Sequence, residues 1–176
     1  MKKTLLALST TAALLLTSAC GGVSGDDKTA ADSLAKAWNG KDAPKSRQAS
    51  NKCIADKWVA AVGADALVEE KVVDKNFRAI GQAPPAKLGK ESATAFGNAV
   101  ADCFDIASMR DDLKKSMQGL DDKTLDAYIK CMDDIDRDLI AQAVRDGKLN
   151  GATAEPTKAT KDLQTVVQTC QEVVQK

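Results

Sequence analysis

Four cysteines spread along the chain constrain its fold more than any other feature of the sequence. They stand far apart, at Cys53, Cys103, Cys131 and Cys170. No two of them form the CxxC spacing of a zinc or redox motif, and the chain has no histidine to complete a zinc shell. We therefore expect no metal site and no cofactor. An even number of widely spaced cysteines is typical of disulfides when a chain is exported.

The first twenty residues indicate export. Two lysines form a short positive start, and the apolar run that follows is shorter than the about 20 residues that span a bilayer. Residues Leu16 to Cys20 (Leu-Thr-Ser-Ala-Cys) then resemble the lipobox of bacterial lipoproteins. The resemblance implies that residues 1–19 are a signal peptide that is removed, and that Cys20 becomes the lipid-bearing N-terminus. The alternative is an ordinary signal peptide with an unmodified Cys20.

Export has consequences for the rest of the chain. A lipid on Cys20 anchors the protein to a membrane without a transmembrane helix. The glycine-rich residues 20–28 are expected to form a lipidated flexible tether, and residues 29–176 have the length of a single domain. In an oxidising compartment the four remaining cysteines are expected to form two disulfides. Four buried thiols are the less usual alternative.

Composition and pattern predict an all-α fold. Aromatic residues make up only 3% of the chain, and no run of β-branched residues alternates with a period of two. We expect a disulfide-stapled helical bundle of about six to seven helices. Their expected bounds are 29–38, 44–62, 65–73, 92–103, 105–117, 124–132 continuing after a bend through 134–144, and 158–174. Residues 81–89, Gly147 and residues 151–156 are expected to lie in loops.

Two segments of the domain are weakly similar, at about residues 43–105 and 121–172. When the first and third domain cysteines are aligned, two predicted helix starts also align. Apolar residues precede the second and fourth cysteines at the same spacings, three and seven residues. Two repeat units, each stapled by its own bridge, favour one of the three pairings that four cysteines allow. The favoured pairs are Cys53–Cys103 and Cys131–Cys170.

Short motifs around these cysteines resemble a group of actinobacterial secreted proteins and lipoproteins. In that group a Cys-Val-Ala-Asp-type helix pairs with a later helix ending in cysteine, twice over. Here the first copy reads Cys-Ile-Ala-Asp from Cys53 and Asp-Cys-Phe-Asp around Cys103, and the second begins Cys-Met-Asp-Asp at Cys131. The resemblance covers about residues 43–172. It implies an exported all-helical domain anchored at the outer face of the cytoplasmic membrane, and it carries no catalytic residue.

A serine and a lysine match part of a catalytic motif. Ser33 and Lys36 have the SxxK spacing of penicillin-interacting serine enzymes, in which the lysine lies one helical turn from the serine. Those enzymes carry further motifs such as KTG, which this chain lacks. We therefore interpret the pair as part of an amphipathic helix with an exposed lysine.

An aspartate cluster imitates part of a calcium loop. Asp134, Asp136 and Asp138 have the spacing of the first three ligands of an EF-hand. Leu139 stands where that loop needs glycine for its tight turn, and the glutamate expected six residues further on is an arginine. Together with Asp133, the cluster is expected to be a solvated helix face rather than a metal site.

The two tryptophans are the largest apolar side chains that could contribute to a ligand surface. Trp58 lies at helical spacing from Cys53 on an apolar stripe, so we expect it in the core. Trp38 is predicted at the end of the first helix. It is the better candidate for an exposed aromatic residue, although a helix that folds back onto the core would also explain it.

Charge and the lack of a catalytic constellation narrow the function. The chain has 25 basic and 25 acidic side chains, which argues against a nucleic-acid partner. We expect a membrane-anchored extracytoplasmic lipoprotein that is not an enzyme but a binding or interaction module of the cell envelope, with an envelope protein as partner. The alternative is a carrier or sensor of an apolar small molecule in a cavity between helices. The sequence identifies no ligand-binding residue.

Overall fold

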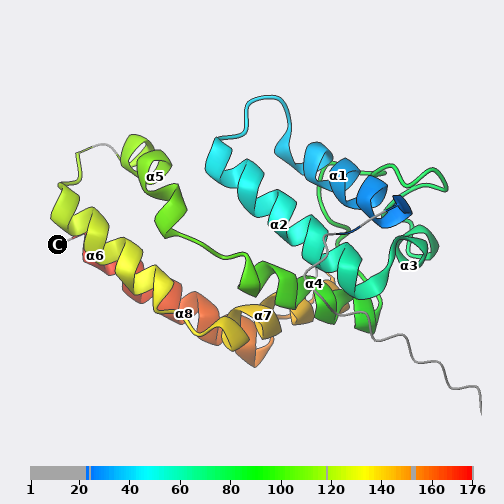
Figure 1. The fold of residues 1–176 in the computed structure, drawn as a ribbon. Helices are drawn as coiled ribbons and strands as arrows, with labels where there is room; N and C mark the ends of the chain where they lie inside the picture. The colour runs from blue at the N-terminus through cyan, green and yellow to red at the C-terminus, as the bar shows by residue number, and fades with distance from the viewer. Residues whose placement is uncertain (1–22, 24, 118, 152–153, 176) are drawn as a thin grey trace, which may run out of the picture.

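The protein is all-helical in the computed structural model, which describes residues 23, 25–117, 119–151 and 154–175. These residues form eight α-helices, two short 3₁₀ helices and one isolated antiparallel bridge between Val73 and Ala79 (Figure 1). The α-helices are α1 (Gly25–Asn39), α2 (Lys45–Val62), α3 (Ala64–Glu69), α4 (Lys90–Asp102), α5 (Arg110–Ser116), α6 (Asp122–Asp133), α7 (Arg137–Asn150) and α8 (Lys158–Glu172). The 3₁₀ helices are η1 (Ala107–Met109) and η2 (Val173–Gln175). The predicted all-α class is confirmed.

Side-chain caps explain why three of the later helices begin where they do. The Asp121 carboxylate accepts from the Thr124 N–H at 2.9 Å before α6, and the Thr157 hydroxyl accepts from the Thr160 N–H before α8. The Asp136 carboxylate accepts from the Asp138 N–H at 2.8 Å before α7. Such caps satisfy N–H groups that have no partner inside the helix. A bend is predicted between residues 132 and 134, but the helix ends at Asp133 and a new helix, capped by Asp136, begins at Arg137.

The first helix begins earlier than predicted. α1 starts at Gly25 rather than Thr29, so residues 25–28 of the predicted tether are helical. Asp26 and Asp27 stand in its first turn, where negative charge interacts favourably with the helix dipole. The Asp27 carboxylate also accepts from the Ala64 N–H at 2.7 Å, which fixes this turn to the start of α3. The signal peptide, Cys20 and the first residues of the tether lie outside the described residues.

Two predicted helices are shorter than expected. α3 ends at Glu69 instead of Val73, because Lys71 takes a positive φ of 58° and the Val72 and Val73 N–H groups both bond to the Leu67 carbonyl. The segment predicted as a helix over 105–117 divides into η1 and α5. The sequence pattern does not predict the early end of α3 or the division of 105–117, because in each case a turn occurs within a stretch whose residues all favour a helix.

The seventh helix is longer than expected, and the prediction of a loop at Gly147 is wrong. α7 continues through Gly147 to Asn150 and ends at Gly151, whose φ is 80°. The added turns bring Leu149 against the core formed by the first four helices, where Val144 of the predicted part also packs. This long-range packing outweighs the modest cost of one glycine inside a helix.

Two apolar cores lie at opposite ends of the molecule. The first is formed by α1 to α4 with partly buried residues of α7, and the second by the end of α4, α6, the start of α7 and Cys170 of α8. Figure 1 shows α1 to α3 at one end and α5, α6 and α8 at the other, with α4 and α7 between them. Val100 of α4 and Val144 of α7 pack against both cores. These two helices therefore join the halves.

The contact between α4 and α7 depends on a glycine. Gly97 is buried in the middle of α4, and a Cβ placed on it would lie 2.4 Å from the Ala141 carbonyl oxygen of α7. A residue without a side chain lets the two helix backbones approach this closely. Among the described residues, no helix is both long enough and apolar enough to cross a membrane.

Candidate ligand-binding cleft

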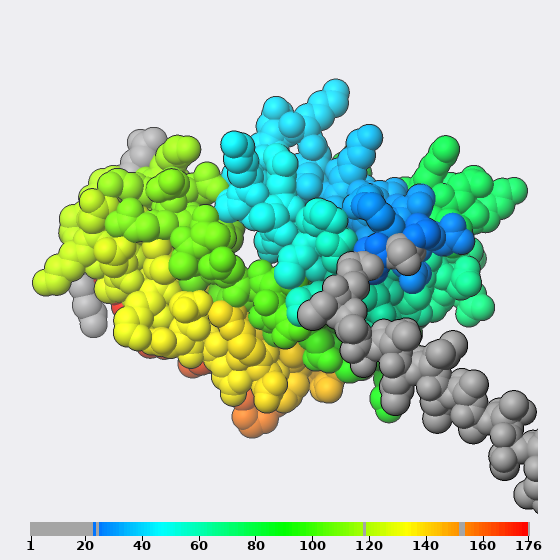
Figure 2. Space-filling view, viewed as in Figure 1, coloured from blue at the N-terminus to red at the C-terminus, as the bar shows by residue number. Residues whose placement is uncertain are grey.

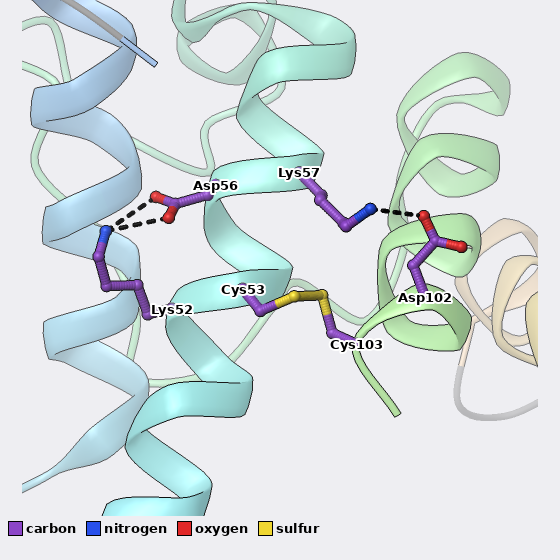
Figure 3. Close-up of a disulfide and its surroundings, with 6 residues drawn as sticks. All are labelled: Lys52, Cys53, Asp56, Lys57, Asp102 and Cys103. Atoms are coloured by element: carbon purple, nitrogen blue, oxygen red, sulfur yellow. Dashed lines mark hydrogen bonds and ion pairs between the residues drawn. A yellow bond between two sulfur atoms is a disulfide. The ribbon is translucent and has the colours of Figure 1, made fainter. Parts of the chain in front are cut away.

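Both predicted disulfides are present. Cys53 of α2 is bonded to Cys103 at the end of α4, with a Cα–Cα distance of 5.8 Å, and Cys131 of α6 is bonded to Cys170 of α8, with a Cα–Cα distance of 5.6 Å. Figure 3 shows the first bridge beside an ion pair between Lys57 and the carboxylate of the neighbouring residue, Asp102, at 2.8 Å. The favoured pairing is therefore confirmed, whereas the repeat that led to it stays a prediction.

The two residues of the SxxK match serve the fold. The Ser33 hydroxyl accepts from the Ala79 N–H at 2.9 Å and so fixes the loop after α3 to α1. Lys36 is exposed on the same helix, as expected. No hydrogen bond joins the Ser33 and Lys36 side chains within the described structure.

The aspartate cluster is a solvated face, as predicted. Asp133 pairs with Arg137 at 3.0 Å and Asp134 with Lys130 at 2.7 Å, both at helical i,i+4 spacing. Asp136 caps α7, a role that sequence reasoning missed although an aspartate before a new apolar helix is a usual cap signal. Over the described residues, no group of three or more Asp, Glu, Cys or His side chains could hold a metal ion.

Three aromatic side chains meet in the first core. Trp58 is fully buried, as predicted, and its indole N–H lies 3.1 Å from the Ser92 carbonyl oxygen and 3.2 Å from the Ser92 hydroxyl. Trp38 folds back and stacks on Trp58 with ring centroids 6.1 Å apart. Phe96 of α4 meets both indoles edge-on, at 4.9 Å from Trp58 and 6.3 Å from Trp38. Half of the six Phe, Trp and Tyr side chains of the chain are therefore gathered at one place.

Trp38 and Phe96 line an open cleft, which we call the aromatic cleft. Its free volume is about 240 Å³. Its walls come from the end of α1, one face of α2, the loop before α4 and α4 itself. The lining residues are Trp38, Arg47, Asn51, Ile54, Gln82, Ala83, Pro84 and Phe96. Apolar rings thus form one part of the lining, while a guanidinium and two amides supply polar groups, which is the composition of many small-ligand sites.

Lys148 of α7 holds the loop that forms one wall of the aromatic cleft. Its ammonium donates to the Pro85 carbonyl oxygen at 2.7 Å and lies 3.4 Å from that of Pro84. The same nitrogen stands 5.4 Å from the centroid of the Phe96 ring, a cation–π contact. Its main-chain carbonyl also accepts from the Leu88 N–H at 2.9 Å. The wall is therefore held through both the main chain and the side chain of one residue.

Burial lowers the pKa of the Lys148 ammonium below its ordinary value of 10.5. The physical cause is desolvation, because partial removal from water disfavours the charged form. The carbonyl oxygens of two prolines are its hydrogen-bond partners, and they bring no negative charge. The wall of the aromatic cleft therefore contains a cation that forms no ion pair with any carboxylate of the described residues.

A second cleft lies beside the first disulfide, and we call it the junction cleft. It has a free volume of about 330 Å³ between α2 and the segment that links α4 to α5. The Ser46 hydroxyl donates to the Asp112 carboxylate and so connects α2 to α5. Figure 2 shows the α5 region and α2 as neighbouring lobes with a gap between them. The lining residues are Ser46, Ala49, Ser50, Cys53, Asp102, Cys103, Asp105 and Ser108.

Sequence reasoning named one residue of the aromatic cleft, Trp38, and missed the others. Arg47 and Gln82 carry no motif, and their role follows only from their position next to the ring cluster. The one available signal was the scarcity of aromatic residues, which makes each of them a candidate for a shared site. Comparisons with family models, with curated proteins and with solved structures returned no match to this chain.

Proposed function

We propose that this protein is a lipid-anchored extracytoplasmic binding module of the cell envelope, that it is not an enzyme, and that it binds its target at the aromatic cleft. The observation that carries the proposal is the cleft itself, where the partly exposed Trp38 ring lies beside the exposed Arg47 guanidinium and the Gln82 amide. Core packing alone does not require a guanidinium at the mouth of a ring cluster. The two disulfides support an oxidising, extracytoplasmic location.

The start of α1 limits the reach of the proposed anchor. Because Gly25 is already helical, the proposed lipid on Cys20 would lie only a few residues before α1. Trp38 lies near the other end of α1, about 20 Å along the helix axis from Gly25. A lipid on Cys20 would therefore hold the domain close to the membrane while the aromatic cleft lies away from the anchored end.

The anchor is tested by fractionation. Wild-type chain is expected in the membrane fraction of its host, with a mass that includes the lipid, whereas Cys20→Ser is expected in the soluble exported fraction. Wild-type protein that is found soluble with an unmodified Cys20 would exclude the lipoprotein proposal.

The binding role is tested by native mass spectrometry of protein purified from its own envelope. We expect a discrete added mass, or a captured envelope protein, that is lost in Ala83→Trp, since this exposed residue lines the cleft and a large ring there would fill it. Ile80→Ala is the matched control, because Ile80 is exposed on the same loop outside the cleft. Binding that persists in Ala83→Trp would exclude the aromatic cleft as the site.

A second candidate function is that of a carrier or sensor of a small molecule. The volume of the aromatic cleft favours it, because about 240 Å³ has room for one small organic molecule and is below the usual size of a drug-binding pocket. In the experiment above, an added mass of a few hundred daltons at near-stoichiometric occupancy would favour this role over that of a protein-binding module.

A further inference from the structure

The aromatic cleft is flanked by two cations without acidic partners. Arg47 lines the cleft and is exposed, and Lys148 stands behind the wall formed by Pro84 and Phe96. Neither side chain forms an ion pair with any described carboxylate. None of the residues that line the cleft is acidic. The charged side chains at the aromatic cleft are therefore both positive.

The contrast with the junction cleft supports this point. That cleft includes two carboxylates among its lining residues, Asp102 and Asp105, and a third carboxylate, Asp112, accepts a hydrogen bond from its serine wall. The charged lining residues of these two clefts are thus opposite in sign. A ligand with a negative group would prefer the aromatic cleft, since like charges repel it from the other.

The apolar part of the aromatic cleft limits the body of the ligand. One face of the Trp38 ring is covered by Trp58. A bound group can therefore contact only the remaining surface of the Trp38 indole, together with Ile54 and Pro84. A flat ring stacks favourably on such a surface. The free volume of about 240 Å³ leaves room for a single ring with a short head group.

We propose that the aromatic cleft binds a small organic carboxylate that carries one flat apolar ring. The ring lies against Trp38 and Pro84, and the carboxylate pairs with the Arg47 guanidinium, whose two parallel N–H groups match the two carboxylate oxygens. The Asn51 side-chain amide N–H donates to the Asn39 side-chain carbonyl oxygen at 2.8 Å, and this hydrogen bond fixes the position of Asn51 in the wall of the cleft. This inference rests on the carrier form of the proposed function.

The test uses two probes of the same shape and different charge, 3-phenylpropanoate and 3-phenylpropanamide. Each is titrated into the full chain, purified from its host in a mild uncharged detergent, and tryptophan fluorescence excited at wavelengths that the probes do not absorb reports binding at Trp38. We expect saturable binding of the carboxylate and at least tenfold weaker binding of the amide. Addition of salt weakens binding of the carboxylate alone, because only that probe is charged.

Arg47→Gln is the variant that tests the ion pair. It is expected to weaken carboxylate binding about tenfold and to leave amide binding unchanged, while Arg78→Gln, an exposed arginine outside the cleft, changes neither. Circular dichroism checks that each variant is folded. Equal affinities for the two probes, no binding of either, or an unchanged carboxylate affinity in Arg47→Gln would each overturn the inference.

The same variant separates this inference from the proposed function. If protein purified from the envelope keeps its added mass in Arg47→Gln but loses it in Ala83→Trp, the cleft is the binding site and the ligand is not held by an ion pair to Arg47. That result overturns the ligand class and leaves the binding role in place. Loss of the added mass in both variants supports both proposals.

Discussion

Replacement of Gly97 by alanine should destabilise the protein, although alanine is the better helix former. Alanine in place of glycine inside a helix contributes about 1 kcal/mol of stability. Here the new Cβ would lie 2.4 Å from the Ala141 carbonyl oxygen, where ordinary contact begins at 3.4 Å. The obstacle is the backbone of α7, which cannot rotate away as a flexible side chain could.

The magnitude follows from the displacement that the clash requires. The two helices must separate locally by about 1 Å, and overpacking of a buried contact costs about 1–3 kcal/mol, occasionally more. Because the clash involves main-chain atoms on both sides, we expect a cost near the upper end of that range. After subtraction of the helix-propensity gain, Gly97→Ala should lower the free energy of unfolding by about 2 kcal/mol. The melting temperature should fall by about 4–8 °C.

The assay is urea unfolding of oxidised protein, followed by circular dichroism for all helices and by tryptophan fluorescence for the first core. Gly147→Ala is the matched control, because this glycine is also inside a helix but nothing lies within 4 Å of a Cβ placed on it. It should stabilise the protein by about 0.5–1 kcal/mol. If both variants shift stability in the same direction, the close approach of α4 and α7 at Gly97 is not as described.

Three further predictions concern the bridges, one cap and the acidic side chains. Removal of either disulfide by paired Cys→Ala changes should lower stability by about 4 kcal/mol, since the bridges close loops of 50 and 39 residues. Urea unfolding of Cys53→Ala/Cys103→Ala against the oxidised wild type, which has both bridges, checks the value. Asp136→Ala should cost about 1 kcal/mol through loss of the α7 cap, whereas Asp134→Ala, whose exposed ion pair contributes little, should stay near wild type in the same assay. The pKa of the Asp121 carboxyl is lowered from 3.8, chiefly because the carboxylate accepts a hydrogen bond from the Thr124 N–H. The charged carboxylate therefore contributes its full stabilisation of the folded state above pH 3.8, and this stabilisation is lost as the pH falls through the lower folded-state pKa. Asp121→Asn should therefore lose less stability than wild type between pH 5 and about pH 2, as measured by urea midpoints; an equal loss in both proteins would contradict the role of this carboxylate.

Helix positions were largely predictable because the signals are local. Pro44 before α2 and the Pro84-Pro85 loop act within a few residues of the chain, and the predicted helix over 44–62 and loop over 81–89 agree closely with the structure. The errors occurred where local signals conflict with distant packing. Glycine at position 147 favours a loop, yet α7 continues through it and Leu149 packs against the first core.

The sequence by itself predicted the class of the fold and the burial of Trp58, and it favoured the pairing of the cysteines that the structure shows. The fold class and the burial of Trp58 follow from helical periodicity and from the apolar stripe of one helix, which are properties of short segments. The pairing was favoured by a spacing that recurs between two segments of the chain. Only the tertiary structure decided that α4 and α7 cross at Gly97 and join the halves, and that Trp38, Pro84 and Phe96 line one cleft. Those residues come from separate helices and a loop, and no pattern within a segment specifies which faces of different segments meet, because that is settled by long-range packing of the whole core.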